Sequence, residues 1–262
     1  MPVKSSKVNI LGVAVDAINM GVAIEKIDQW IQSGASQYVC VTPVHSVMEC
    51  QDDDDLRDIF NQAGMVTPDG MPVVWICNWF GFKDARRVYG PDLMLTLCDH
   101  SQKPGYRHFF YGGAEGVAPT LSENLQKRFP DMKSVGTLSP PYKALSESEN
   151  RAMVDTINAA NPDIVWVGLG SPKQERWMAK NIDVLNASVV IGVGAAFDFH
   201  VGRVRQAPAW MQRSGMEWFF RLIMEPRRLW RRYLIGNSRF VVKFFMQVTG
   251  LKSYAIATPR LN

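Results

Sequence analysis

The sequence predicts an α/β fold with a Rossmann-like, mainly parallel sheet, helices on both faces, and a basic helical appendage at the C-terminus. Three observations support this prediction. Short apolar runs alternate with helix-like stretches over the first 200 or so residues. Several of the apolar runs lead directly into glycine-rich loops. The alternation then stops after Arg203, where basic and aromatic residues become dense.

The apolar runs rich in β-branched residues predict strands, and the segments between them predict helices. We expect strands at 8–15, 38–42, 65–67, 108–111, 134–137, 164–167 and 189–193. We expect helices at 20–32, 55–62, 72–80, 92–100, 116–129, 147–160 and 173–181. Ser146 and Glu149 have the spacing of a capping box at a helix start. No internal repeat or low-complexity stretch is present in the sequence.

The C-terminal region differs in charge from the rest of the chain. From Arg203 to Asn262 there are 12 Lys and Arg residues against two acids, a net charge of +10. Residues 1–202 carry a net charge of −6. The region 217–245 predicts helix interrupted near Pro226 and Gly236. We therefore expect an α/β catalytic domain at 1–205 and a helical appendage at 206–262, whose basic and aromatic residues suit either nucleic-acid binding or a membrane-associating role at an anionic surface.

Composition narrows the class of protein. The four cysteines, Cys40, Cys50, Cys77 and Cys98, form no C-x-x-C pair, so neither a disulfide framework nor a zinc site is expected, and a reducing cytoplasm fits. The N-terminus lacks the apolar segment of a signal peptide. No apolar run approaches the roughly 18 residues needed to span a bilayer.

Glycine-rich loops follow three of the predicted strands. They contain Gly112 and Gly113, Gly168 and Gly170, and Gly192 and Gly194. Glycine lets the backbone approach a ligand, and amide groups at a following helix start favour anions. These loops predict a phosphate-bearing ligand, with Lys173, Gln174, Glu175 and Asp198 as polar side chains placed to contact it. The Gly112 loop does not follow the first strand, so it is only a weak sign of dinucleotide binding.

Asp69 follows an apolar strand in the turn Thr67-Pro68-Asp69-Gly70. Turn chemistry alone explains such a segment. The functional interpretation is a carboxylate at the carboxyl end of a strand that acts as a general base. Arg87 precedes a glycine turn, where it forms either part of a surface pair with Arg86 or a clamp for phosphate or carboxylate.

The sequence offers no clear metal site. Asp52–Asp55 contains the D-x-D pattern of some metal-dependent sugar transferases, but we expect it to open a helix, where acids complement the helix dipole. The four histidines lack metal-ligand spacing. His45, after Thr42-Pro43-Val44, is nevertheless placed near the end of a predicted strand.

Several of these segments occur in an order that resembles the WecG/TagA/CpsF family of bacterial glycosyltransferases. The segments are Thr42-Pro43, 67–70, 87–93, Gly112-Gly113, 168–175, 194–198, Gly202-Arg203, Glu217-Trp218, Arg221 and 225–231. Together they span nearly the whole chain. The sequence departs from the pattern at Val44, where many members of the family carry Asn.

The resemblance implies an inverting enzyme without a cofactor. Its donor would be a UDP-sugar, and its acceptor a polyprenyl-diphosphate-linked saccharide used for cell-surface or exopolysaccharide synthesis. The family's base falls on Asp69, its substrate-contacting residues on Thr42, Arg87 and Gln174, and its appendage arginines on Arg221, Arg228 and Arg231. With no convincing metal site, arginines would balance the phosphate charge. N-acetylmannosamine, its uronic acid and glucose remain open as the transferred sugar.

The expected partners follow from this interpretation. They are the two substrates and an anionic membrane surface at the cytoplasmic face of the plasma membrane, with a homo-oligomer left open. The alternative is a basic-tail module that binds nucleic acid or membrane without catalysis, but it leaves Asp69 and the glycine loops unexplained. A nucleotide-sugar dehydrogenase or epimerase would need G-x-G-x-x-G after the first strand, and Leu11–Asp16 does not supply it.

Overall fold

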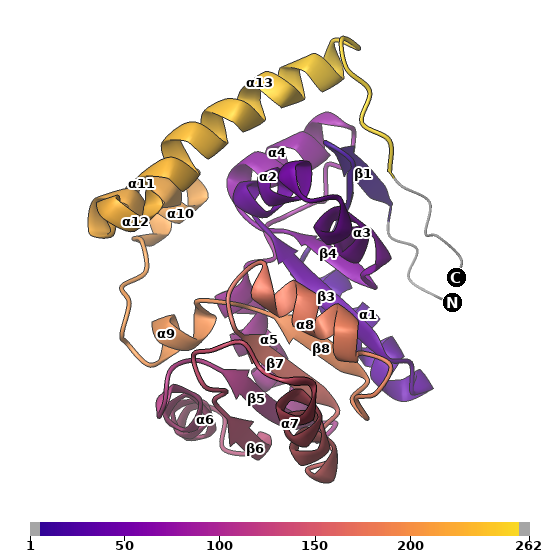
Figure 1. The fold of residues 1–262 in the computed structure, drawn as a ribbon, viewed down its shortest axis with the longest axis vertical. Coiled ribbons are helices and arrows are strands. Elements are labelled where there is room, and N and C mark those ends of the chain that lie inside the picture. The colour runs from indigo at the N-terminus through magenta and orange to yellow at the C-terminus, as the bar shows by residue number, and fades with distance from the viewer. Residues whose placement is uncertain (1–5, 257–262) are drawn as a thin grey trace. The chain divides into compact units, whose positions relative to one another are not determined.

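The computed structural model describes residues 6–256 and confirms the predicted α/β class (Figure 1). Six strands form one sheet in the order β4-β3-β8-β7-β5-β6. Their bounds are β3 Gln37–Thr42, β4 Met65–Pro68, β5 Arg107–Gly112, β6 Lys133–Leu138, β7 Ile164–Gly168 and β8 Val189–Gly192. The pairs β3–β8, β8–β7, β7–β5 and β5–β6 are parallel. All six strands agree with the predicted ranges to within about two residues.

The first predicted strand, at 8–15, is wrong. The segment forms an antiparallel hairpin of β1 Lys7–Ile10 and β2 Val13–Asp16, in which Ile10 pairs with Val13. Leu11 and Gly12 form its turn with φ angles of +52° and +84°. Two left-handed residues match the right-handed twist of a hairpin, but leucine is rare at such a position. Because Leu11 continues the apolar run, the turn between the two strands could not be recognised in the sequence.

The contacts of the chain define two compact units. Of the described residues, the first unit contains 21–40 and 90–205, and the second contains 6–20, 41–89 and 206–256. The chain passes from the first unit to the second after Arg205, where the sequence predicted a boundary. The division into domains 1–205 and 206–262 stays a prediction, because both units are discontinuous in sequence.

The first unit has a core of aromatic and β-branched side chains. Phe109, Tyr111, Trp166 and Phe197 are almost completely buried. The indole of Trp166 donates to Nδ1 of His108 at 3.0 Å, so its polar atom is satisfied inside the core. The helices of this part are α1 Met20–Ser33, α5 Gly90–Ser101, α6 Val117–Arg128, α7 Glu147–Ala159, α8 Lys173–Asn181 and α9 Ala196–His200. The predicted capping box of Ser146 and Glu149 is confirmed at the start of α7.

The second unit combines the N-terminal hairpin with helices from the middle and the end of the chain. Its helices are α2 Val44–Asp52, α3 Asp54–Gln62, α4 Met71–Trp79, α10 Ala209–Arg213, α11 Glu217–Met224, α12 Pro226–Trp230 and α13 Gly236–Val248. A π-helical segment, η1 Arg231–Ile235, lies between α12 and α13. The predicted interruption near Pro226 is confirmed. The predicted helix start at the aspartate run is also confirmed, because the Asp53 carboxylate caps α3 by accepting from the Leu56 amide.

The C-terminal segment packs closely within the second unit. Gln247 accepts a hydrogen bond from the Leu11 amide and donates one to the Asn9 carbonyl, both at 2.9 Å. Arg239 forms a bidentate pair with Asp52 at 2.9 and 2.6 Å. Leu229, Tyr233 and Phe240 are buried. Residues 206–256, which we call the tail, therefore contribute to the core of this unit as well as to its surface.

Glycine at position 168 is required by packing, and this can be tested. A Cβ at Gly168 would lie 2.8 Å from the ring of Phe197, which is itself buried. We expect Gly168→Ala to reduce the free energy of unfolding by about 1–3 kcal/mol, the usual cost of overpacking. Chemical denaturation measures this change.

Gly236→Ala is the matched control. Gly236 has helical φ and ψ of −61° and −48°, and its nearest non-local atom to a new Cβ is 4.0 Å away. Alanine should therefore stabilise the helix by about 0.5–1 kcal/mol. Equal effects of the two substitutions would contradict the packing argument.

Candidate active site

Asp69 lies directly after β4, where the sequence predicted a strand-end carboxylate. Its amide donates to the Thr42 carbonyl at 3.2 Å, so the ends of β4 and β3 hold Asp69 and Thr42 together. Gly70 then turns the chain into α4 with a φ of +82°, a conformation that favours glycine. The turn interpretation and the functional one are thus compatible, because the turn presents the carboxylate.

Arg87 is brought to Asp69 by a backbone segment that runs beside the end of β4. The Val88 amide donates to the Pro68 carbonyl at 3.0 Å, and the Thr67 hydroxyl donates to the Val88 carbonyl at 3.2 Å. In this position Nε of Arg87 donates to Oδ1 of Asp69 at 3.0 Å. Oδ2 of Asp69 accepts no hydrogen bond from the described residues, which leaves one carboxylate oxygen for a substrate.

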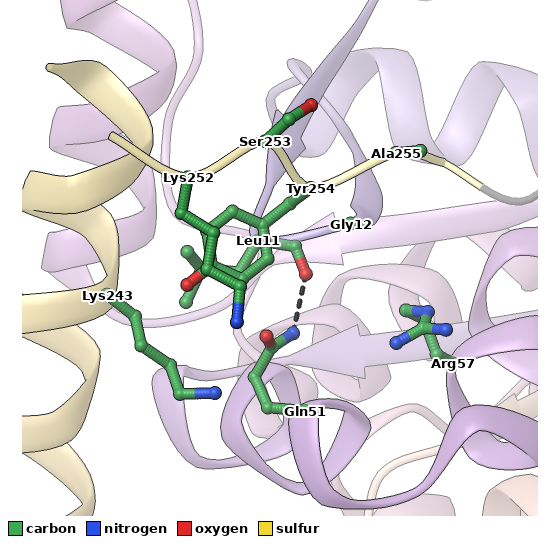
Figure 2. Close-up of a pocket in the computed structure, with 9 residues that line it drawn as sticks. All are labelled: Leu11, Gly12, Gln51, Arg57, Lys243, Lys252, Ser253, Tyr254 and Ala255. Atoms are coloured by element: carbon green, nitrogen blue, oxygen red, sulfur yellow. Dashed lines mark hydrogen bonds between the residues drawn. The ribbon is translucent and has the colours of Figure 1, made fainter. Parts of the chain in front are cut away.

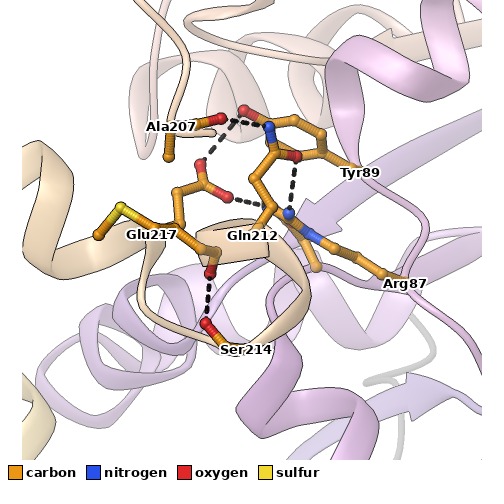
Figure 3. A network of polar contacts seen from close by, with 8 residues as sticks. Arg87, Tyr89, Ala207, Gln212, Ser214 and Glu217 are labelled. Atoms are coloured by element: carbon orange, nitrogen blue, oxygen red, sulfur yellow. Dashed lines mark hydrogen bonds and ion pairs between the residues drawn. The ribbon is translucent and has the colours of Figure 1, made fainter. Parts of the chain in front are cut away.

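The tail completes the environment of Arg87 (Figure 3). Nη2 of Arg87 donates to Oε2 of Glu217 at 2.6 Å, and the Tyr89 hydroxyl donates to the other Glu217 oxygen at 3.2 Å. The guanidinium carbon lies 3.8 Å from the centre of the Tyr89 ring. Nη1 also reaches Gln212, at 3.5 Å, and Gln212 donates to the Ala207 carbonyl at 2.8 Å. We call Asp69, Arg87, Tyr89, Gln212 and Glu217 the Asp69 cluster.

Burial sets the electrostatics of this cluster. The side chains of Asp69, Arg87 and Glu217 are 12%, 15% and 14% exposed. Desolvation raises the pKa of Asp69, the positive charge of Arg87 opposes this shift, and the negative charge of Glu217 adds to it. Burial lowers the pKa of Arg87, but the negative charges of Asp69 and Glu217 raise it by more, so its pKa lies above the usual value. Arg87 therefore stays charged, while Asp69 holds a proton more readily than an exposed aspartate does.

The arginines of the tail have different surroundings. Arg221 lies on α11, Arg228 on α12 and Arg231 in η1, so the three arginines come from three successive segments. The helix breaks because Glu225 leaves helical geometry, with φ −136° and ψ 59°, ahead of Pro226. Arg228 forms a bidentate pair with Glu225, and the guanidinium of Arg231 lies 5.2 Å from the Trp230 ring centre.

Arg221 interacts electrostatically with Asp69. Its charge lowers the pKa of Asp69, against the larger effect of burial. It also acts on His45, whose pKa is lowered by burial and then by the charges of Arg232 and Arg221. His45 is therefore neutral at pH 7, and two guanidinium groups lie near it.

The predicted glycine residues of the first unit pack against one another. The Gly113 amide donates to the Gly168 carbonyl at 3.0 Å, and a Cβ at Gly112 would lie 2.6 Å from the Gly168 backbone. Close packing of β5 against β7 thus leaves no room for a side chain at Gly112, while Val117 crowds Gly113 and Phe197 crowds Gly168. Gly170 differs, because it has a φ of +76° and open space around it.

Gln174 connects two of the glycine loops. Its side-chain carbonyl accepts from the Gly194 amide at 2.9 Å, and its amide donates to Oε1 of Glu175 at 2.9 Å. Lys173 is exposed at the start of α8, with its ammonium 5.1 Å from the Tyr142 ring centre. Asp198, on α9, lies 3.9 Å from Arg203. The structure brings Gly170, Gln174 and Gly194 together, whereas the side chain of Lys173 lies near Tyr142 and that of Asp198 near Arg203.

Four residues of the second unit received no role from the sequence: Tyr89, Gln212, Glu217 and Arg232. Tyr89 and Glu217 stand within the family-like segments, yet an acid in a basic helix is typical of a solvated salt bridge. Only its burial against Arg87 identifies Glu217 as part of the cluster. Within residues 6–256, no group of three His, Cys, Asp or Glu side chains is arranged to hold a metal ion.

The fold and the Asp69 cluster place a buried carboxylate, paired with an arginine, at a strand end of an α/β protein, an arrangement typical of enzymes. The family model for the WecG/TagA/CpsF glycosyl transferases matches residues 8–254, so the chain belongs to this family and is a glycosyltransferase. The resemblance inferred from the motifs is thereby confirmed. Of the helices described by the structure, none has the length and hydropathy required to cross a membrane.

Several curated relatives share the name N-acetylglucosaminyldiphosphoundecaprenol N-acetyl-β-D-mannosaminyltransferase. The chain is 34% identical to that of Bacillus spizizenii over 176 residues, which is 67% of this chain and 66% of the relative. It is 32% identical to that of Bacillus subtilis over 182 residues, 70% of this chain and 69% of the relative. The Staphylococcus aureus protein of strain MW2 is 25% identical over 250 residues, 95% of this chain and 94% of the relative.

Glu217 should tune the proton affinity of Asp69. Glu217→Gln removes a negative charge that raises the pKa of Asp69, so this pKa should fall. Carbon-13 NMR of labelled aspartate carboxyl groups, followed over pH, measures the change directly.

The control variant is Glu225→Gln. It removes the other acid of the tail, which pairs with Arg228 and does not contact the cluster. The pKa of Asp69 should stay unchanged in this variant. An Asp69 pKa that rises or stays constant in Glu217→Gln would refute the electrostatic coupling.

Proposed function

We propose that this glycosyltransferase moves N-acetylmannosamine from a UDP-sugar onto N-acetylglucosamine linked to a polyprenyl diphosphate. The observation that carries the proposal is that Asp69, in a chain of this family, is buried beside Arg87. Its Oδ1 accepts from Arg87, while its Oδ2 accepts from none of the described residues. The names of the relatives support the transferred sugar and the acceptor. The uronic acid and glucose are the competing donor sugars.

Asp69 acts as the general base in this proposal. Oδ2 takes the proton of the acceptor hydroxyl while the hydroxyl oxygen bonds to the anomeric carbon of the donor, and the bond from that carbon to UDP breaks. A single displacement inverts the anomeric carbon, which accords with the β-linkage in the names of the relatives. The raised pKa of Asp69 makes it a stronger proton acceptor than an exposed carboxylate. Arg87 keeps the carboxylate oriented.

The phosphate groups of the two substrates need positive partners, since the leaving UDP gains charge as the bond breaks. For the donor we propose the loops after β7 and β8, with Gly170, Lys173 and Gln174, together with the predicted contacts of Gly112, Gly113, Gly168 and Asp198. For the diphosphate of the acceptor we propose Arg221 and Arg232, whose charges reach His45. Thr42 lies beside Asp69 and is proposed to contact the reacting sugar.

The acceptor lipid implies a membrane surface, and the tail has the properties to bind one. Helix α13 exposes an apolar row of Val241, Val242, Phe245 and Val248. The surrounding tail carries a net charge of +10 from Arg203 onward. Apolar burial and attraction to anionic lipids then act together, at about 1 kcal/mol for each basic residue near the surface. We propose peripheral attachment at the cytoplasmic face of the plasma membrane.

Asp69→Asn tests the base. We expect turnover to fall roughly 10²–10⁴-fold, the usual contribution of a positioned base, with donor affinity little changed. Product formation is measured by mass spectrometry with a polyprenyl-diphosphate-N-acetylglucosamine acceptor and a panel of UDP-sugars. Asp55→Asn, at an exposed helix start, is the control and should retain full activity.

Two results would contradict this proposal. Wild-type turnover in Asp69→Asn excludes Asp69 as the base. Transfer from UDP-glucose or the uronic acid, but not from UDP-N-acetylmannosamine, excludes the proposed sugar while leaving the base assignment intact.

Arg221 and Arg228 should differ in their effects on transfer. With a short-chain, water-soluble acceptor, where membrane binding no longer matters, Arg221→Gln should reduce kcat/KM by about tenfold or more, because a charged hydrogen bond is lost. Arg228 is already paired with Glu225, so Arg228→Gln should stay within about threefold of wild type. Equal losses in both variants would argue that the tail binds through net charge rather than through Arg221.

A further inference from the structure

A basic pocket in the second unit lies outside the Asp69 cluster and is not used by the proposed reaction. It has a volume of about 310 Å³ and is lined by the turn of the N-terminal hairpin, by α2 and α3, and by the end of the tail (Figure 2). Lys243 and Lys252 reach it from the C-terminal segment, and Arg57 reaches it from α3. None of the nine residues that line the pocket is an aspartate or glutamate.

The positive groups of this pocket are incompletely neutralised by the protein. Asp52, the nearby acid, is held in a bidentate pair by Arg239. Arg57, which lines the pocket, pairs through Nη1 with the exposed Asp54 at 3.0 Å. Within the described part of the chain, neither Lys243 nor Lys252 has an ion-pair partner. Burial and the charges of Lys252 and Arg239 lower the pKa of Lys243, although Asp52 partly opposes them.

Two polar atoms in the lining residues are unsatisfied. Nε of Arg57 and the hydroxyl of Tyr254 are buried, and neither has a hydrogen-bond partner among the described residues. A buried donor without a partner costs about 1–3 kcal/mol, so such atoms are rare unless something binds them. Both atoms belong to residues of the same pocket. An anion with several acceptor oxygens would give the guanidinium of Arg57 and the two ammonium groups a common partner.

The number and direction of these donors favour phosphate. The donors come from opposite sides of the pocket, which suits the tetrahedral oxygens of a phosphate better than the two oxygens of a carboxylate. The volume of about 310 Å³ is roughly ten times that of one liquid water, so a phosphate and the group esterified to it fit.

We propose that Arg57, Lys243 and Lys252 bind the phosphate of a phosphate ester in this pocket, at a site separate from the Asp69 cluster. The ester has two natural sources, the headgroup of an anionic phospholipid or a soluble phosphate ester. The first is favoured by the neighbouring apolar face of α13, which carries Lys243 on its other side. A bound phosphate would also join the hairpin, α3 and the tail.

Titration calorimetry with sn-glycerol 1-phosphate tests the site. In the full-length protein, Lys243→Gln and Lys252→Gln should each weaken binding at least about tenfold. Arg227→Gln is the matched control, because it removes the same charge from an exposed position of the tail. The titrations are repeated in an Arg221→Gln background, so that phosphate bound near Asp69 is not counted.

Vesicle binding identifies the source of the phosphate. If the ester is a lipid headgroup, the two lysine variants should lose affinity for phosphatidylglycerol vesicles beyond the loss in Arg227→Gln. If it is soluble, the vesicle affinities of all three variants should match while glycerol phosphate binding is still lost from the lysine variants. Phosphatidylcholine vesicles control for apolar contacts.

The proposal also predicts an unusual stability effect. Without phosphate, Lys243→Gln should unfold at the same temperature as wild type or higher, because it relieves repulsion with Lys252 and Arg239. The rise in Tm that glycerol phosphate produces in wild type should be lost in this variant. Lysine variants that bind glycerol phosphate and both vesicles as Arg227→Gln does would overturn the proposal.

Discussion

The second unit depends on a buried guanidinium held between two carboxylates. Arg87 contacts Asp69 after β4 and Glu217 at the start of α11, and it stacks on Tyr89. Such an arrangement adds little net stability, because desolvation offsets the Coulomb attraction. Removing one partner, however, leaves a charge buried without compensation, at about 3–5 kcal/mol. The cluster therefore selects one position of the tail against the strand ends more than it strengthens the fold.

The same arrangement connects the tail to the chemistry. Glu217 brings α11 against Arg87, and α11 carries Arg221, whose charge is felt by both Asp69 and His45. The tail is strongly basic, and its two acids are both engaged with arginines, Glu217 with Arg87 and Glu225 with Arg228. Arg239 pairs with Asp52, whereas Arg213 and Arg227 are exposed, so part of the positive charge faces solvent, where anionic partners can reach it. The C-terminal tail thus supplies the buried partner of Arg87, a positive charge near the proposed base Asp69, and the surface proposed to bind the membrane.

Much of the fold could be predicted from the sequence, because strands buried in a parallel sheet are apolar over their whole length. The hairpin turn was missed because Leu11 continues an apolar run, and α2 was missed because it follows β3 without a capping signal. Asp69 and Arg87 were identified by strand-end and turn chemistry. Their contact across 18 residues could not be predicted, and neither could the pair of Arg87 with Glu217, which lies 130 residues further along the chain. The glycines at 112, 113 and 168 were predicted to contact a ligand, and the structure adds a packing constraint at each that the sequence did not reveal.

The hydrogen bonds between the hairpin and the tail also bear on how the chain is made. Asn9 donates to the Tyr254 carbonyl across 245 residues, and Gln247 reaches back to Asn9 and Leu11. The hairpin leaves the ribosome well before its partners, which are translated between 236 and 245 residues later. The second unit therefore cannot complete its native contacts while the residues between them are being synthesised. A nascent chain interrupted before Tyr254 would expose the hairpin edge and a basic, apolar surface, which makes such fragments natural substrates for chaperones and proteases.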